Sequence, residues 1–315
     1  MPASASLVED AGATASAPSE FFRSPPFMAA EGVTHSLVIA GAGWSEAIPV
    51  IVRPVPGTEL LDAISPYGYP GAQDPPTTTT APAPGEVDWS ETGLVSVFVR
   101  DRIGGPLALA GGTERARVQI ADPSRGSGVR KRLGQQIRRN QRRGWTVAPR
   151  PGPEVTDEER EAFERAYAET MARTGASDRY LYDSDYFRGV LSAERSWLLL
   201  ARRGEEPPSA GAIAAISDGH LHYYLGGTAE EALGDSPMKN LFAGMIELAG
   251  ELAMPLHLGG GITPGDSLDE FKRGFANGTE AFVTHEVVCD PTAYERLSSA
   301  AGPAPDGFFP AYRAS

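Results

Sequence analysis

The chain has 315 residues and a formal net charge of −13, with 41% hydrophobic and 22% charged residues. This length exceeds the ~100–200 residues of one ordinary domain, so we expect two domains, or one domain with elaborations. The acidic balance argues against a general nucleic-acid binder, because that affinity comes from neutralised phosphates. The single cysteine, Cys289, excludes an internal disulfide and a multi-cysteine metal site, and we interpret it as a small residue filling a strand.

The N-terminal segment shows no targeting signal. No run in the chain reaches the roughly 18 apolar residues of a membrane helix, and the start lacks the basic and apolar regions of a signal peptide. We therefore predict a cytoplasmic protein. Residues 1–18 are small, polar and aperiodic, and are predicted to be disordered.

Residues 19–150 are predicted to form a first domain dominated by strands. GAGWSE at 41–46 is predicted to join two strands rich in β-branched residues. The turn-rich stretch at 65–73, SPYGYPGAQ, contains Tyr67 and Tyr69. These rings either stack on a ligand or pack within the protein, and the sequence leaves both interpretations open. The predicted strands are 35–41, 47–55, 94–100 and 115–121.

A strongly basic helix is predicted over about residues 128–143. Leu133 and Ile137 lie one turn apart and can bury one side of it, and Gly144 suits a left-handed cap. Like charges one turn apart destabilise a helix, so the run favours an anionic partner over a merely solvated face. Residues 125–143 hold no acidic side chain and eight basic ones: Arg125, Arg130, Lys131, Arg132, Arg138, Arg139, Arg142 and Arg143.

Residues 151–300 are predicted to form a second domain that mixes helices and strands. Thr156 and Glu159 predict a capping box, and Asp218-Gly219 predicts a hairpin turn. This succession indicates an α/β (α+β) fold around a largely antiparallel sheet. The predicted helices are 156–175, 183–193, 236–252 and 266–275, and the predicted strands are 196–202, 210–217, 220–228, 255–260 and 280–288. Residues 301–315 are predicted to be a C-terminal tail.

His220 and His222 alternate onto one face of a predicted strand. No third ligand lies near them in sequence, so we interpret them as half-buried strand residues and predict no metal site.

Six stretches carry a family resemblance: 65–73, 95–100, 132–147, 163–176, 222–228 and 257–276. The basic helix and the run HLGGGITPGDSLDEFKRGFA are the most specific of them. On these stretches the chain resembles the FemAB-like branch of the GNAT superfamily, which contains peptidoglycan-bridge aminoacyltransferases and relatives in antibiotic assembly.

The resemblance implies two tandem GNAT-like domains, with the catalytic one at residues 151–300. It implies that an acceptor amine attacks the ester carbonyl of an aminoacyl-tRNA, which forms an amide and frees the tRNA. Other relatives use an acyl thioester. The helical arm of the longer cell-wall enzymes is not expected, because no sustained heptad occurs.

The same resemblance assigns site residues. Phe271-Lys272 matches the family's Phe-Lys pair, and a fixed cation there would stabilise the oxyanion of the transition state. Gly259, Gly260 and Gly261 would let backbone approach a ligand closely. The alternative is that the glycines only form a tight turn and that Lys272 is a surface charge. Arg138, Arg139, Arg142 and Arg143 are the predicted phosphate contacts. Arg100 is a candidate for binding an acceptor carboxylate or phosphate, and the alternative is an exposed salt bridge. Tyr67 and Tyr69 are candidate substrate-binding residues.

Three functions remain open. The preferred one is an aminoacyl-tRNA-dependent aminoacyltransferase with a small peptide, a secondary-metabolite precursor or a peptidoglycan precursor as acceptor, needing neither bound cofactor, metal nor membrane. The second is an acyl-CoA-dependent acyltransferase, disfavoured because residues 226–240 lack the phosphate-binding glycine spacing and carry Glu230, Glu231 and Asp235. The third is a catalytically silent RNA-binding or scaffold protein.

Overall fold

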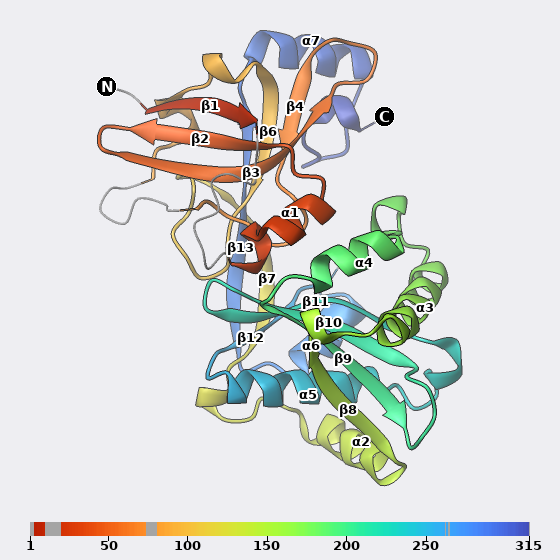
Figure 1. Ribbon diagram of the computed structural model, residues 1–315. Helices are drawn as coiled ribbons and strands as arrows, with labels where there is room; N and C mark the ends of the chain where they lie inside the picture. Colours follow the sequence, from red (N-terminus) through yellow and green to blue (C-terminus); the bar gives the residue numbers. More distant parts are fainter. Residues whose placement is uncertain (1–2, 10–19, 74–80, 262, 264, 315) are drawn as a thin grey trace. The chain divides into compact units, whose positions relative to one another are not determined.

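The computed structural model describes residues 3–9, 20–73, 81–261, 263 and 265–314. The chain divides into two compact units, which we call unit 1 (Met1–Arg115 with Ala281–Ser315) and unit 2 (Ala116–Glu280). The predicted mixed α/β fold is confirmed, with strands and helices combined in both units (Figure 1).

The division between the units differs from the predicted boundary near residue 150. The chain leaves unit 1 within β7 (Thr113–Ala121), so the basic helix belongs to unit 2. It returns within β13 (Gly278–Val288), which pairs antiparallel with β6 (Leu94–Arg100). A strand pairing between segments about 185 residues apart in sequence places the C-terminal segment in unit 1, and no local signal predicts such a pairing.

Unit 1 is built on strands in the order β5-β1-β2-β3-β4-β6-β13. The expected hairpin is present, with Gly41 opposite Trp44 at its turn. Alternating residues of the paired strands, such as Leu37, Ile39 and Ile48, are fully buried and form the core. The other elements are β1 (Ala3–Glu9), β2 (His35–Gly41), β3 (Trp44–Pro54), β4 (Leu61–Ile64), β5 (Val87–Asp88), α1 (Pro25–Ala30) and α7 (Pro291–Ala301).

The prediction of disorder for residues 1–18 is wrong for residues 3–9. These residues form β1, which pairs antiparallel with β2 from Ser4–Ala40 to Glu9–His35. Their small side chains alternate, and Ala3 and Ala5 are buried in the core. The low hydrophobicity of residues 3–9 therefore did not predict a strand, because this strand is stabilised by its pairing with β2. Residues 1–2 and 10–18 lie outside the described residues.

The predicted C-terminal tail is folded onto unit 1. Helix α7, which the sequence did not predict, precedes it. The Tyr312 hydroxyl donates a 3.1 Å hydrogen bond to the buried carboxylate of Asp62, and the guanidinium of Arg313 pairs with the same group. Arg53 also pairs with Asp62, at 3.0 Å. A buried carboxylate needs such partners, so it holds the tail in place.

Unit 2 is a sheet in the order β7-β12-β11-β10-β9-β8, with helices on both faces (Figure 1). Helices α3 and α4 cover one face, α5 covers the other, and α2 packs against α5 and β8. The strands are β8 (Trp145–Pro151), β9 (Ser196–Arg203), β10 (Ala210–Ser217), β11 (His220–Thr228) and β12 (Leu256–Gly259). The helices are α2 (Lys131–Arg142), α3 (Asp157–Thr174), α4 (Ser184–Leu191), α5 (Met238–Glu251) and α6 (Ser267–Arg273).

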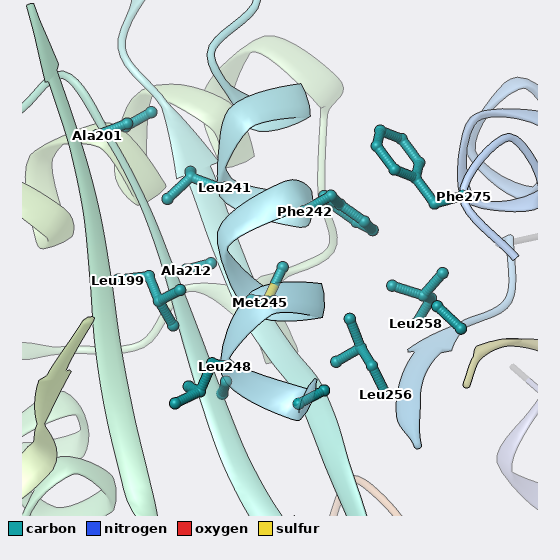
Figure 2. Packing of buried hydrophobic residues seen from close by; sticks show 14 of the residues in the cluster. Leu199, Ala201, Ala212, Leu241, Phe242, Met245, Leu248, Leu256, Leu258 and Phe275 are labelled. Atoms are coloured by element: carbon teal, nitrogen blue, oxygen red, sulfur yellow. The ribbon is translucent and has the colours of Figure 1, made fainter. Parts of the chain in front are cut away.

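The local signals in unit 2 act as expected. Thr156 and Glu159 form the capping box of α3. Asp218 and Gly219 both take positive φ, 49° and 76°, as the tight hairpin between β10 and β11 requires. The core lies along α5, with Leu199, Ala201 and Ala212 on one side of the helix and Leu256, Leu258 and Phe275 on the other (Figure 2).

Candidate active site

Helix α6 presents Lys272, and the loop before it fixes where the helix starts. Asp266 caps the helix, since its Oδ1 accepts a 2.8 Å hydrogen bond from the backbone N–H of Asp269. Its Oδ2 accepts a 3.0 Å hydrogen bond from the N–H of Thr263. A Cβ on Gly261 would lie 2.2 Å from Asp266 Oδ1, so the loop tolerates only glycine beside this cap.

Lys272 is buried, with 6% of its surface exposed. Its Nζ donates a 2.7 Å hydrogen bond to the carbonyl oxygen of Gly260 and lies 5.4 Å from the centre of the Tyr223 ring. Among the described residues, no carboxylate forms an ion pair with it. Burial lowers the pKa of Lys272 to about 8, an effect that the more distant Asp266 and Asp269 oppose.

Gly259 is favoured by its left-handed backbone conformation and lies next to the amine of Lys272. Gly259 has a φ of +74°, and a Cβ at this position would lie 3.0 Å from Lys272 Nζ. Gly260 has no heavy atom closer than 3.8 Å to its Cβ position, so its contribution is the carbonyl that Lys272 binds. Gly259 and Gly260 therefore lie directly against the amine. Because Lys272 is buried, it is not the surface charge of the alternative interpretation.

Other contacts anchor α6 to the sheet. Gln119 of β7 donates a 2.9 Å hydrogen bond to Asp269 Oδ1, and Arg273 pairs with the same carboxylate. Phe271 lies 5.2 Å from the ring of Phe242 and 5.3 Å from that of Phe275. The structure thus places Phe271 in the packing beneath α6, where it positions Lys272.

The strand pairing beside the amine is irregular. The register of β10 and β11 shifts so that Leu225 is opposite Ile213 while Tyr223 is opposite Ala214, which leaves Tyr224 as an extra residue. The parallel pairing of β11 with β12 covers only Leu221 and His222, although β11 continues to Thr228. The ring of Tyr223, which contacts Lys272, comes just after the paired segment.

Three imidazoles follow one another on this part of the sheet. His222 and His257 have ring centroids 4.8 Å apart, and His220 lies 5.9 Å from His222. Burial lowers the pKa of His222 to about 3, and that of His257 well below its usual value. The interpretation of His220 and His222 as half-buried residues is wrong, because their side chains are buried, with at most 8% of the residue surface exposed. The register that pairs His222 with His257 brings them together, and sequence reasoning missed it.

The basic helix lies in the same unit as Lys272. Arg138, Arg139 and Arg142 are exposed and form no ion pair with any residue that the structure describes. Arg143 differs, since it pairs with Asp235 at 2.5 Å. The predicted phosphate contacts therefore divide into three exposed cations and one neutralised cation.

A groove of about 360 Å³ runs between α2 and α6. Leu133 and Phe271 are among its apolar residues, and Arg130 and Arg132 supply positive charge. Arg130 pairs with Glu270 across it. The groove links the basic helix to the helix that carries Lys272.

The predicted acceptor-binding residues lie in unit 1. The guanidinium of Arg100 donates to the carbonyl oxygen of Ser65 and lies 5.0 Å from the centre of the Phe98 ring. Tyr67 is 37% exposed, whereas Tyr69 packs edge-on against other aromatic rings. The loop that carries both tyrosines is thus held by Arg100, and Tyr67 is its accessible ring.

A buried polar pair near Arg100 is structural. Asp101 Oδ2 and His285 Nε2 are 2.6 Å apart, and Asp101 Oδ1 accepts a hydrogen bond from the N–H of Ala108. Both side chains are at most 2% exposed, so an acceptor amine does not reach them. We therefore assign no general base here.

The described residues contain neither a cluster of metal ligands nor a membrane-spanning helix. No group of three or more His, Cys, Asp or Glu side chains in the described ranges is arranged to hold a metal ion. None of the helices in the described part of the chain has the length and apolar character to span a membrane.

Comparison with known proteins finds a matching domain model and several solved structures with the same fold. Residues 127–273 match the family model described as an acetyltransferase (GNAT) domain. The crystal structure of FemX shares the fold, with a TM-score of 0.55 and 14% identity over 83% of this chain and 89% of that one. Residues 127–273 thus resemble a GNAT acetyltransferase domain, and the chain shares its fold with FemX.

Two further solved structures share the fold of this chain. One is the C-terminal domain of a putative lysylphosphatidylglycerol synthetase from Agrobacterium fabrum, with a TM-score of 0.58 and 15% identity over 90% of this chain and 92% of that one. The other is L-PGS from Bacillus licheniformis, with a TM-score of 0.55 and 12% identity over 84% and 86%. No curated protein matches the sequence.

Proposed function

We propose that this protein is an aminoacyl-tRNA-dependent aminoacyltransferase that forms an amide bond on an amine acceptor. The observation that carries the proposal is the buried ammonium of Lys272, which has one carbonyl partner and no carboxylate partner among the described residues. The acceptor classes are a small peptide or secondary-metabolite precursor, as in antibiotic biosynthesis, or a peptidoglycan precursor. The cytoplasm is the proposed location, and charged tRNA is the co-substrate in place of a bound cofactor.

The proposed reaction begins when the acceptor amine attacks the ester carbonyl of the charged tRNA. The carbonyl oxygen then becomes negative, and the Lys272 ammonium donates a hydrogen bond to it. Such a donor in a water-poor site contributes about 3–4 kcal/mol of selective transition-state stabilisation. Collapse of the intermediate breaks the bond to the terminal ribose oxygen, which takes a proton, while the attacking nitrogen loses one to solvent.

The basic helix supports tRNA as the acyl donor. Arg138, Arg139 and Arg142 project a charge of +3 without internal neutralisation among the described residues. Like charges on one helix stabilise the protein only when an anion lies against them. A phosphate backbone on this helix would place the end of the RNA near the groove that leads to α6.

The turn that precedes α5 supports tRNA over acyl-CoA. A pyrophosphate would need free backbone N–H groups there. The N–H of Glu230 instead donates a 2.7 Å hydrogen bond to the carboxylate of Glu169. Glu231 adds a further negative charge. Acyl-CoA remains the second candidate donor, because the matching family model describes an acetyltransferase domain.

A transfer assay distinguishes the donors. The protein is incubated with tRNA charged with radiolabelled amino acids, or with labelled acetyl-CoA, and a pool of small peptide amines. The proposal expects transfer from tRNA that is lost after RNase treatment and in Lys272→Ala. Transfer from acetyl-CoA alone, insensitive to RNase, would establish the second candidate. RNA binding without transfer from either donor would indicate a catalytically silent binding protein.

A further inference from the structure

A second cavity lies in unit 2, between α3 and the segment leading into α4. Its volume of about 770 Å³ falls within the ~300–1,000 Å³ of small-molecule sites. It shares no lining residue with the surroundings of Lys272 described above. Most of its lining is apolar or aromatic, including Tyr167, Met171, Leu181, Tyr182 and Phe187.

The aromatic wall is held in place without a ligand. The hydroxyl of Tyr167 donates a 3.0 Å hydrogen bond to the carbonyl oxygen of Tyr180, and its ring lies 5.2 Å from that of Phe187. Tyr182 stacks on Tyr186 with ring centroids 3.7 Å apart. Rings fixed in this way lose little freedom when a ligand binds. Leu181 is 58% exposed, so this apolar surface is open to solvent.

Two carboxylates line the cavity and give it negative charge. Glu161 is exposed and forms no ion pair with any residue that the structure describes. Glu164 shares the guanidinium of Arg160 with Asp157, so one cation faces two carboxylates. The acidic charge on this part of α3 is therefore only partly neutralised.

The basic lining residue Arg165 does not reverse this charge. Its guanidinium lies 3.3 Å from the carbonyl oxygen of Pro208 and 3.7 Å from the carboxylate of Glu231. These partners belong to segments that do not line the cavity. The cavity thus combines aromatic walls with excess negative charge.

We propose that this cavity binds a small molecule with an apolar or aromatic body and a protonated amine. The carboxylates attract the ammonium, the aromatic rings favour a cation beside them, and the apolar walls bury the body of the ligand. The proposal does not depend on tRNA-dependent transfer, because it concerns binding alone.

Three probes with similar bodies test the charge requirement. They are 2-phenylethylamine (protonated at pH 7), 2-phenylethanol (neutral) and phenylacetate (anionic), and isothermal titration calorimetry measures the Kd of each. We expect the amine to bind about tenfold more tightly than phenylacetate, with the alcohol between them. Phenylacetate binding as tightly as the amine would overturn the proposal.

Variants locate the site. Combined Glu161→Gln and Glu164→Gln is expected to weaken amine binding by about fivefold and to leave alcohol binding unchanged, because both side chains are partly solvated. Glu158→Gln is the matched control on the same helix outside the cavity, and should have no effect. An unchanged amine Kd in the double variant would overturn the proposal.

A third variant fills the cavity. Ala168 is exposed and lines it, so Ala168→Trp is expected to block all three probes without changing the thermal unfolding temperature. Size-exclusion chromatography tests a competing occupant. A dimer of the unaltered protein that Ala168→Trp dissociates would show that a second copy covers the cavity, and would also overturn the proposal.

Discussion

Lys272 has an amine that burial makes costly to keep charged. Its pKa of about 8 means that most molecules still carry the cation at neutral pH, in a place where little water competes for it. A cation in this state stabilises a negative oxygen more strongly than an exposed one does. The same buried charge lowers the stability of the folded protein, because burial disfavours the charged form.

Lys272→Met is expected to lower the transfer rate and to raise stability. The rate should fall by about 10²–10³-fold, the effect of removing one oxyanion donor. The pKa shift from 10.5 to about 8 corresponds to roughly 3 kcal/mol, reduced by the hydrogen bond that the Gly260 carbonyl loses. Transfer assays and urea unfolding measure the two effects. Lys239→Met is the control for the rate, and a less stable Lys272→Met would contradict the prediction.

The pH dependence follows from the same group. Above pH 8 Lys272 loses its proton, so the cationic mechanism predicts a transfer rate that declines through this pH. Lys272→Arg keeps its charge and should be slower but lack that decline. A rate that rises through pH 8 in the unaltered protein and is flat in Lys272→Arg would instead indicate that the neutral amine is the active form.

The same shift also makes stability depend on pH. The unfolded chain holds this proton up to about pH 10.5, whereas the folded chain releases it near pH 8. The cost of the buried cation is therefore fully present below pH 8, and stability should increase between pH 8 and pH 10.5. Lys272→Met should lack this increase in urea unfolding.

Helix α2 carries three arginines whose positive charge no described carboxylate neutralises. Replacing Arg138, Arg139 and Arg142 together with Gln should weaken tRNA binding and lower the dependence of log Kd on log salt by about 2. These side chains are exposed and have no ion pairs among the described residues, so folding should not change. Filter binding over a range of salt concentrations measures both quantities.

A matched control distinguishes the effect of the α2 arginines from the effect of the protein's net charge. Arg173, Arg179 and Arg188 are also exposed in unit 2, and changing them to Gln removes the same charge from other helices and loops. This control should leave the salt dependence unchanged. An equal loss in both variants would show that net charge, not α2, attracts the RNA.

At the scale of the whole molecule, the C-terminal segment closes unit 1. Arg313→Ala removes a charged partner from the buried carboxylate of Asp62 and should cost about 1–3 kcal/mol of stability. Differential scanning calorimetry measures the change. Arg296→Ala, on exposed α7, is the control and should be nearly neutral. An equally small effect at both positions would show that Arg53 and Tyr312 suffice to hold the carboxylate.

Much of the fold and part of the site could be predicted because the responsible interactions are local. The capping box of α3, the Asp218-Gly219 turn and the basic run of α2 involve residues within one element or one turn. The glycine run before Phe271-Lys272 could also be proposed as a candidate site. Its geometry could not, because the surroundings of the amine include Tyr223, which the separate strand β11 supplies.

The amino-acid sequence by itself determined the order of most helices and strands, their caps and turns, and the family resemblance. Only the tertiary structure decided that residues 3–9 form a strand, that the C-terminal segment returns to unit 1, and that His222 faces His257. It also decided that Lys272 is a buried cation. The physical reason is that caps and turns are set by neighbouring residues, whereas strand register and burial depend on segments far apart in the chain.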